Sequence, residues 1–524
     1  MSINVSTTPD VSDTAAMSDH AHRTSLYALR LKRMAIDTYQ EPVIYMHLDC
    51  HVCRAEGFEA QARVQLAYNG HVIIATLNVV TGGWLALDEA GLSEAAWRLL
   101  GARAGDAVSV SHPPVLESLS LVRAKVYGKR LGDADLRAIM RDIAAGRYAD
   151  IHLSAFIAAC AGDRLDLAET VALTRAMIDA GERLVWGRAP VVDKHCVGGL
   201  PGNRTTLIVV PIVAAFGLTM PKTSSRAITS PAGTADVMET LAQVELDVPA
   251  MRRVVEREGG CIVWGGSVRL SPADDILIRI ERPLDLDSEG QLVASVLSKK
   301  AAAGSTHVVI DIPVGETAKV RSAPAAQMLS ARLIEVGQAI GLTVQTVVTD
   351  GAQPVGRGIG PALEARDVLA VLRRAADAPI VLRERALQLA GAVLEFAPGV
   401  TPGTGVQRAR EILDDGRAWK KFEAICAAQG GLRELPVAAH THVVTAAQRG
   451  RVTSIDNRRL ARVAKFAGAP RAPAAGLELH TPLGSVVEAG QPLFTLHAQA
   501  PGELAYALDY IAAQPGIVRV QAES

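Results

Sequence analysis

The hydrophobic and polar positions along this chain change period several times, and each change predicts a different kind of element. Short apolar runs separated by polar or glycine positions are typical of β-strands, as in VIYMHL, ARVQLAY and HVIIATLNVV. A Gly-Asp turn and a Pro-Pro pair follow in GARAGDAVSVSHPPV. The pattern therefore predicts a small β-rich domain over residues 26–115.

Apolar residues next recur at helical spacing. Leu136, Ile139, Met140 and Ile143 share one helical face, and Asp133 or Asp135 can act as the N-cap. The segments DIHLSAFIAACAG and DLAETVALTRAMIDAGE continue the same period. We predict three helices that form an all-helical domain over residues 116–185.

Strand-like and helix-like segments alternate from residue 186 to about 425, which is the pattern of a mostly parallel sheet. Residues 426–524 return to short strands with a helix. The predicted fold class is therefore multidomain α/β, with a helical domain and a central, mostly parallel α/β domain. A small β-rich N-terminal domain and an α+β C-terminal domain flank them. Residues 1–25 are polar, and we expect a disordered tail there.

Composition narrows the class of protein. Of the 524 residues, 49% are hydrophobic and 21% are charged, so a folded protein with a sizeable core is expected. The formal net charge of −1 gives no attraction to nucleic acid or to an anionic membrane. Six cysteines do not make a disulfide scaffold, and the start of the chain lacks the apolar stretch of a signal peptide. The longest uncharged apolar segment, 205–221, is short for a membrane span. We expect a cytoplasmic protein.

The stretch VDKHCVGGLPGNRTT, residues 192–206, has the pattern of a strand, a glycine loop and a helix start. Glycines allow close approach of the backbone and positive φ, and a helix N-terminus offers free N–H groups to an anion. Lys194 adds charge, and Thr205 and Thr206 add hydroxyl groups. The loop lacks the Gly-Lys-Ser/Thr of nucleoside-triphosphate loops. It indicates a phosphate site of another kind, or else only a tight strand-to-helix turn.

A second stretch, KTSSRAITSPAGTADVMETL at 222–241, again places hydroxyl groups before a helix. Ser230 is a candidate N-cap with Pro231 at the first helical position. One such loop is usually only a capped helix, but two in one α/β domain suggest a shared anion site. The hydroxyl residues are Ser224, Ser225, Thr229, Ser230 and Thr234.

A third stretch, RPLDLDSEGQLVASVLSKKAAAG at 282–304, places Asp285 and Asp287 before a helix. That helix carries Ser295, Lys299 and Lys300. The aspartates could be helix caps, and the lysines could belong to a solvated face. Farther on, DIPVGETAKV places Lys319 after a strand and a glycine turn.

Together DKHCVGG, SSRAITSPAGTAD, SVLSKKAAAG and GAQPVGRGIGPALEA resemble the thymidine phosphorylases and their relatives, the pyrimidine nucleoside phosphorylases. The GGxPGN loop and the additional N-terminal β-domain resemble the AMP phosphorylase branch most closely. The resemblance covers nearly the whole chain after residue 25. It implies a pentosyltransferase, in which inorganic phosphate attacks the anomeric carbon of a nucleoside or nucleotide to give free base and pentose 1-phosphate.

The same resemblance implies roles for individual residues. It places His195 and Asp287 in catalysis, with Asp287 as proton donor. An arginine that grips the pyrimidine carbonyl in thymidine phosphorylases falls near Ile280 here, with Arg279 and Arg282 close by. A serine of that family is replaced by Cys196. The implied phosphate ligands are Lys194, Gly198, Gly199, Thr206, Ser224 and Thr234. The implied substrate-binding residues are Gly199, Ser225, Arg226, Ala227, Ile228, Thr229, Ser230, Ser295, Lys299 and Lys319.

The sequence leaves two other functional interpretations open. An anthranilate-type phosphoribosyltransferase shares the GTADVMETL-like segment but needs a magnesium-binding acid pair, for which Asp274-Asp275 is the nearby candidate. A non-catalytic binding relative would be expected to lose Lys194 or the hydroxyl loops, which are present. We expect small-molecule substrates, no cofactor, no nucleic-acid or membrane partner, and a homodimer joined through the helical domain.

Two further motifs receive structural interpretations. MHLDCHVC contains a lone CxxC with two histidines, and we expect no metal there because structural zinc needs four well-spaced ligands. HTPLGSVVEAGQPLFTLHA resembles the half-hammerhead of lipoyl- and biotinyl-like folds without their attachment lysine. We therefore expect a purely structural C-terminal domain.

Overall fold

A computed structural model describes residues 28–522 except 228, 229, 269, 285 and 287. The chain divides into two compact units. One contains the chain up to Val126 together with Asp142–Phe156, and the other contains Tyr127–Arg141 and everything from Ile157 onward. The predicted tail, Ile228, Thr229, Asp285 and Asp287 lie outside the described residues.

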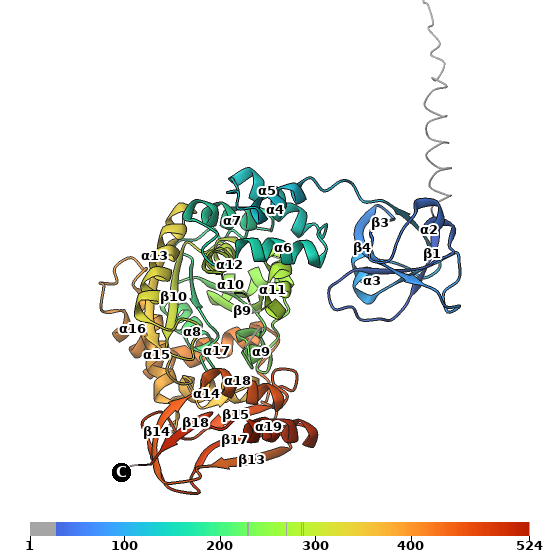
Figure 1. The fold of residues 1–524 in the computed structure, drawn as a ribbon. Coiled ribbons are helices and arrows are strands. Elements are labelled where there is room, and N and C mark those ends of the chain that lie inside the picture. The colour runs from blue at the N-terminus through green and yellow to red at the C-terminus, as the bar shows by residue number, and fades with distance from the viewer. Residues whose placement is uncertain (1–27, 228–229, 269, 285, 287, 523–524) are drawn as a thin grey trace, which may run out of the picture. The chain divides into compact units, whose positions relative to one another are not determined.

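In the first unit six strands close into a barrel, in the order β1-β5-β2-β4-β3-β6 (Figure 1). Alternate side chains of the strands fill the barrel interior. In β3, Val64, Leu66 and Tyr68 are buried, whereas the residues between them are partly exposed. The elements are β1 (Ala28–Arg33), β2 (Val43–His47), α2 (His51–Glu56), β3 (Arg63–Tyr68), β4 (His71–Val80), β5 (Glu89–Leu92), α3 (Glu94–Leu100) and β6 (Ala107–Ser111).

The CxxC of the barrel has a local structural role. Cys50 is the N-cap of α2, and its sulfur accepts a hydrogen bond from the Cys53 amide at 3.1 Å. Both side chains are buried in the barrel core. Within the described residues, no group of three or more His, Cys, Asp or Glu side chains could hold a metal ion.

Four helices, not the three expected, follow the barrel: α4 (Ser118–Val126), α5 (Asp133–Ala144), α6 (Asp150–Cys160) and α7 (Leu167–Asp179). Helix α4 was missed because SLSLVRAKV mixes apolar and polar residues without a clear helical period. In α5, Asp133 is the first helical residue, and the Asp135 carboxylate accepts from the Gly132 amide at 3.1 Å. Neither aspartate is therefore the N-cap that the sequence suggested.

The central part of the second unit is built on parallel strands. Strands β11-β10-β7 form one sheet and β8-β9 another, and a parallel bridge between Val191 and Thr219 joins the two. All five strands therefore end at the same edge. They are β7 (Val192–Cys196), β8 (Met220–Ser224), β9 (Gly260–Trp264), β10 (His307–Val314) and β11 (Thr343–Asp350). The predicted fold class is confirmed.

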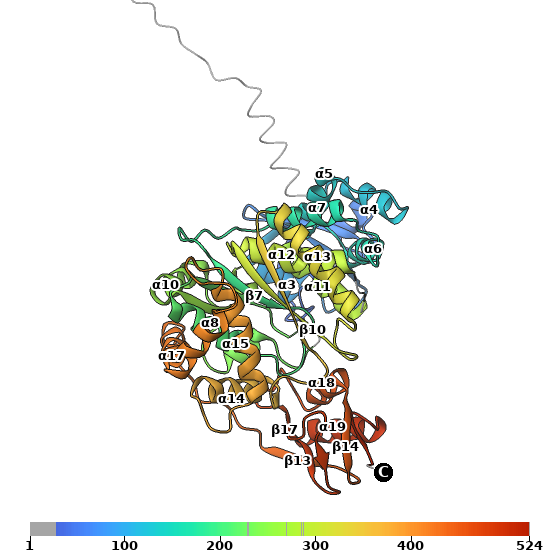
Figure 2. The ribbon, with the colours of Figure 1, turned by 90° about the vertical axis from the view of Figure 1, so that its left-hand side faces the viewer.

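Helices cover both faces of this sheet (Figures 1 and 2). Along β10, Val308, Ile310 and Ile312 pack with α12 and α13, whereas Val309 packs on the opposite side with α8 and α15. The helices are α8 (Thr206–Phe216), α9 (Thr234–Glu239), α10 (Val248–Glu258), α11 (Pro272–Leu284), α12 (Glu289–Ala302), α13 (Ala323–Ala339), α14 (Pro361–Leu372), α15 (Ile380–Leu394), α16 (Gly405–Asp414) and α17 (Arg417–Ala428).

The apolar segment 205–221 is a core helix followed by a strand. Helix α8 is buried from Thr206 to Ala214, which explains why it is apolar on every side. None of the helices that the structure describes is long and apolar enough to cross a membrane.

Two small sheets form the C-terminal part, in the orders β12-β15-β17-β13 and β16-β14-β18. Two helices, where the sequence suggested one, accompany them: α18 (Asn457–Phe466) and α19 (Pro501–Ala513). The strands are β12 (Gly358–Ile359), β13 (His440–Thr445), β14 (Gly450–Ile455), β15 (Gly476–Leu479), β16 (Val486–Val487), β17 (Pro492–Ala498) and β18 (Val518–Gln521). Strand β12 lies within GRGIG, directly before α14, so this sheet begins beside the central domain.

Candidate functional site

The end of β7 carries a buried lysine at the edge where the parallel strands terminate. Lys194 is only 1% exposed, and its ammonium donates a hydrogen bond to the Thr205 hydroxyl at 2.7 Å. Among the described residues it forms no ion pair with a carboxylate. Burial lowers its pKa, since a buried ammonium without a counter-ion is costly. An anion at this edge would supply the missing charge.

The loop after β7 needs its glycines. Gly198, Gly199 and Gly202 have φ of 110°, 55° and 70°, as the sequence predicted. A Cβ at Gly198 would lie 2.8 Å from the Cβ of Lys319, and one at Gly202 would lie 2.9 Å from the Gly356 nitrogen. The loop is therefore pressed against two other strand-end segments, and Lys319 is brought beside it.

A buried polar network below this loop accounts for Cys196. The Asn203 amide donates to the Cys196 sulfur and to the Asp311 carboxylate, both at 3.1 Å. Asp311 also accepts from the Thr349 hydroxyl at 2.6 Å, and the Thr205 hydroxyl donates to the Asn203 carbonyl at 3.2 Å. Cys196 thus serves as an acceptor that holds Asn203. The network connects β7, β10 and β11 to Thr205, the residue that Lys194 contacts.

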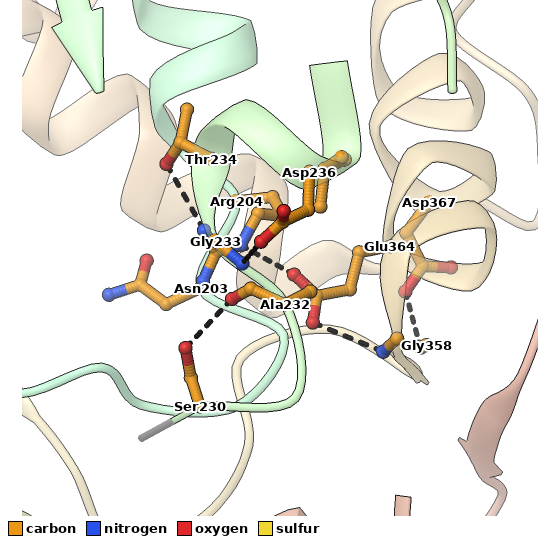
Figure 3. A network of polar contacts seen from close by, with 12 residues as sticks. Asn203, Arg204, Ser230, Ala232, Gly233, Thr234, Asp236, Gly358, Glu364 and Asp367 are labelled. Carbon is orange, nitrogen blue, oxygen red and sulfur yellow. Dashed lines mark hydrogen bonds and ion pairs between the residues drawn. The ribbon is translucent and has the colours of Figure 1, made fainter. Parts of the chain in front are cut away.

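The second hydroxyl loop follows β8 and is held by one carboxylate. Asp236 accepts from the amides of Gly233 at 2.7 Å and Ala227 at 2.6 Å. Ser224 is 9% exposed at the end of β8. Helix α9 begins at Thr234 with Gly233 as N-cap, so the expectation that Ser230 is the N-cap was wrong. The Ser230 hydroxyl instead donates to the Ala232 carbonyl at 2.9 Å (Figure 3).

Arg226, a predicted substrate-binding residue, has its guanidinium occupied within the protein. It pairs with Glu239 and with Glu245, the latter at 2.9 Å, and stacks over the ring of Trp264. In the same segment Ser225 is exposed and Ala227 half-buried. Their role in substrate binding remains a prediction.

The two hydroxyl loops are joined directly. Arg204, which precedes α8, donates from a terminal guanidinium nitrogen to the Thr234 hydroxyl at 3.1 Å, as Figure 3 shows. Thr206 is the first residue of α8 and is 5% exposed. The expected proximity of the two loops is therefore what the structure has.

The lysines of α12 do not lie on a solvated face. Lys300 is 3% exposed and its ammonium lies 2.8 Å from the Asp193 carboxylate, which also pairs with Lys222 at 3.2 Å. Lys299 pairs with Asp274 at 2.5 Å. Ser295, on the same helix, is half-buried, and Ser288 is the N-cap. This side of the site is therefore lined with paired cations.

Comparison with known proteins shows which family the chain belongs to. Three family models match: the helical bundle domain of a glycosyl transferase family at residues 119–181, its a/b domain at 188–419, and the pyrimidine nucleoside phosphorylase C-terminal domain at 451–517. A protein of Acidovorax sp. (strain JS42) named "Putative thymidine phosphorylase 2" is 70% identical, over 96% of this chain and 99% of its own length. The chain belongs to the pyrimidine nucleoside phosphorylase family.

A relative of lower sequence identity carries the same kind of name. A "Putative thymidine phosphorylase" of Legionella pneumophila (strain Corby) is 60% identical over 94% of this chain and 95% of its own length. Among solved structures, anthranilate phosphoribosyltransferase from Thermus thermophilus matches with a TM-score of 0.50 and 21% identity. That match covers 59% of this chain and 99% of the other, and it shows likeness of fold alone.

Burial and the neighbouring lysines together set the protonation state of His195 in this phosphorylase. Burial, reinforced by Lys300, Lys222, Lys194 and Lys299, lowers the pKa of His195 well below its usual value. The imidazole is therefore neutral at pH 7, and it suits hydrogen bonding to a substrate better than stabilisation of a developing negative charge.

Sequence reasoning overlooked Glu281 on α11, an acidic residue within electrostatic range of Lys299 and Lys319. Burial and Asp274 raise the pKa of Glu281 to about 7, while Lys319 and Lys299 oppose the shift. A carboxyl group that titrates near neutrality can carry a proton to a leaving group. In the sequence its only signal is its place shortly before Asp285 and Asp287, the two aspartates that could be helix caps. Asp287, the proton donor that the resemblance implies, lies outside the described residues.

Lys222 should make the stability of this phosphorylase depend on pH. Burial lowers its pKa to about 7, from an ordinary value of about 10.4. Between these values the unfolded chain binds more protons than the folded one, so the free energy of unfolding rises with pH, by at most about 1.4 kcal/mol per unit. Urea unfolding at pH 7, 8 and 9 should show a smaller rise for Lys222→Met than for wild type. Lys129→Met, at an exposed lysine, is the control, and equal slopes in all three proteins would contradict the assignment.

Proposed function

We propose that this protein cleaves the N-glycosidic bond of a nucleoside or nucleoside 5′-monophosphate with inorganic phosphate, giving free base and a pentose 1-phosphate. The observation that carries the proposal is Lys194, a buried ammonium without a carboxylate partner among the described residues, placed where two hydroxyl loops meet. Phosphate is a co-substrate, and the reaction as written needs no further cofactor.

In the proposed reaction a phosphate oxygen forms a bond to C1′ while the bond from C1′ to the base nitrogen breaks. The base leaves with the bonding electrons and takes up a proton. Phosphate would be held by Lys194, the Gly198 and Gly199 backbone, Thr206, Ser224 and Thr234. Such positioning of the nucleophile supplies much of the catalysis. His195, Ser295 and Lys299 would face the base, with Asp287 as its proton donor.

Thymidine is the first candidate substrate, because close relatives carry names of thymidine phosphorylases. The products would be thymine and 2-deoxyribose 1-phosphate. A nucleoside monophosphate such as AMP is the second candidate, and two observations favour it. Ile280, near which the pyrimidine-gripping arginine of thymidine phosphorylases falls, is a buried apolar residue. Lys319 lies beside Gly198, where it could pair with a 5′-phosphate.

The two candidates differ in what Lys319→Met should do. If a 5′-phosphate pairs with Lys319, the KM for AMP, CMP or UMP should rise about tenfold or more, since a hydrogen bond to a charged group is worth about 1.5–3 kcal/mol. The KM for thymidine should not change. Steady-state release of free base from thymidine, uridine, AMP, CMP and UMP measures both the preference and the effect. An unchanged KM for every nucleotide would remove Lys319 from the substrate site.

The anthranilate-type alternative is not favoured. Asp274, one member of its candidate acid pair, is occupied by an ion pair with Lys299. We further propose a cytoplasmic homodimer, with the helical domain as the dimer interface.

A further inference from the structure

Arg204 and Glu364 form a buried ion pair behind the proposed phosphate site. Their side chains are 7% and 1% exposed, and Arg204 Nε lies 2.5 Å from Glu364 Oε2. A second nitrogen of the same guanidinium donates to the Thr234 hydroxyl. Three segments that are distant in sequence therefore meet at one side chain: the glycine loop, the start of α9, and α14 (Figure 3).

The hydrogen bond from Arg204 fixes the direction of the Thr234 hydroxyl proton. A hydroxyl group has one hydrogen to donate and two lone pairs that accept. Because Arg204 has no acceptor, the Thr234 oxygen must accept, and its own hydrogen points away from the guanidinium. Thr234 is half-buried at the edge of the site, so this hydrogen is available to an anion there.

Helix α14 supports this arrangement from behind. Glu364 also accepts from the Gly360 amide at 3.2 Å. Asp367, on the same helix, accepts from the amides of Arg357 and Gly358, both at 2.7 Å. The 356–360 segment so fixed is the one that contacts Gly202 of the glycine loop. The two carboxylates of α14 thereby hold both the guanidinium and the segment against which the loop rests.

We propose that Arg204 is a positioning residue that acts through Thr234: it directs the Thr234 hydroxyl proton to the attacking phosphate and keeps the two phosphate loops in register, with Glu364 as its anchor. The inference rests on the proposed phosphorolytic function and names residues that the sequence motifs did not assign.

The test separates the KM for phosphate from the KM for the nucleoside. Removing Arg204 alone would leave Glu364 buried and unpaired, so the paired variant Arg204→Met/Glu364→Met is used, since apolar replacement of a buried ion pair is often neutral for stability. The KM for phosphate should rise about tenfold or more, as expected for loss of an oriented hydrogen bond to a charged group. The KM for the nucleoside should stay within about twofold, because Arg204 acts on the phosphate loops and not on the base side of the site. Arg204→Lys, which keeps the charge but not the fork, should fall between wild type and the paired variant.

A double-mutant cycle with Thr234→Val shows whether Arg204 acts through Thr234. Thr234→Val should raise the KM for phosphate by itself, and adding the Arg204→Met/Glu364→Met pair should raise it little further. Additive increases, or a phosphate KM unchanged in a folded paired variant, would overturn the inference while leaving phosphorolysis intact. Cleavage by wild type that does not depend on phosphate would instead overturn the proposed function itself. Thermal unfolding of each variant confirms that it is folded.

Discussion

Replacing Lys194 with Met is expected to lower kcat/KM for phosphate-dependent cleavage by about 10²–10³-fold or more, the range seen when one oriented group at a developing charge is removed. Lys194 is the buried ammonium that no carboxylate neutralises in the described part of the chain. Without it, an incoming phosphate would keep its hydroxyl and backbone contacts but lose its buried counter-charge. Initial rates of base release over a range of phosphate concentrations measure the effect.

The same substitution should leave the folded state as stable as wild type or more so. Met fills a similar volume, and the cost of burying an ammonium without an ion-pair partner disappears. Function held at the expense of stability is common at active sites. Lys129→Met, which replaces an exposed lysine, is the control, and neither its rate nor its stability should change. A Lys194→Met protein with wild-type turnover would remove Lys194 from the site.

Of the single substitutions proposed for this protein, Asp193→Asn should cause the largest loss of stability. Asp193 is fully buried and is shared by Lys222 and Lys300, whose attraction outweighs burial and keeps the pKa of its carboxyl group low. The substitution leaves the Lys300 ammonium, and the protonated fraction of Lys222, buried without their common carboxylate. Breaking a buried ion pair in this way costs about 3–5 kcal/mol. The free energy of unfolding, from urea denaturation near pH 7, measures the loss.

Two further variants sharpen this result. Asp88→Asn breaks the exposed ion pair with Arg30 and should lower the free energy of unfolding far less, because exposed pairs are worth little. Asp193→Asn/Lys222→Met removes one of the stranded charges and should recover part of the lost stability. If Asp193→Asn cost no more than Asp88→Asn, the buried triad would not stabilise the fold.

Local sequence signals predicted the parts of this molecule that depend on neighbouring residues. The positive φ of Gly198, Gly199 and Gly202 followed from the loop sequence, because glycine adopts that conformation at no steric cost. The alternation of strands and helices likewise predicted the parallel sheet, and with it the edge where Lys194 and Ser224 lie. These features need no knowledge of distant partners.

Partners distant in sequence could not be predicted in the same way. Glu364 lies far along the chain from Arg204, and Asp311 far from Asn203, and nothing local marks either carboxylate as a partner. The sequence left open whether Lys300 lies on a solvent-exposed helix face, because helical spacing alone does not reveal which face packs against Asp193. The cysteine at position 196, where a serine was expected, is explained only by Asn203, which folds back to meet its sulfur.

The central claim is that inorganic phosphate is the nucleophile that this site holds. Incubation of the wild-type protein with thymidine, and separately with AMP, in the presence and absence of phosphate tests it most directly, with the sugar product followed by ³¹P NMR. We predict that free base appears only when phosphate is present, in equal amount to a new pentose 1-phosphate. Release of base at the same rate without phosphate, with no phosphorus bound to C1, would contradict the claim.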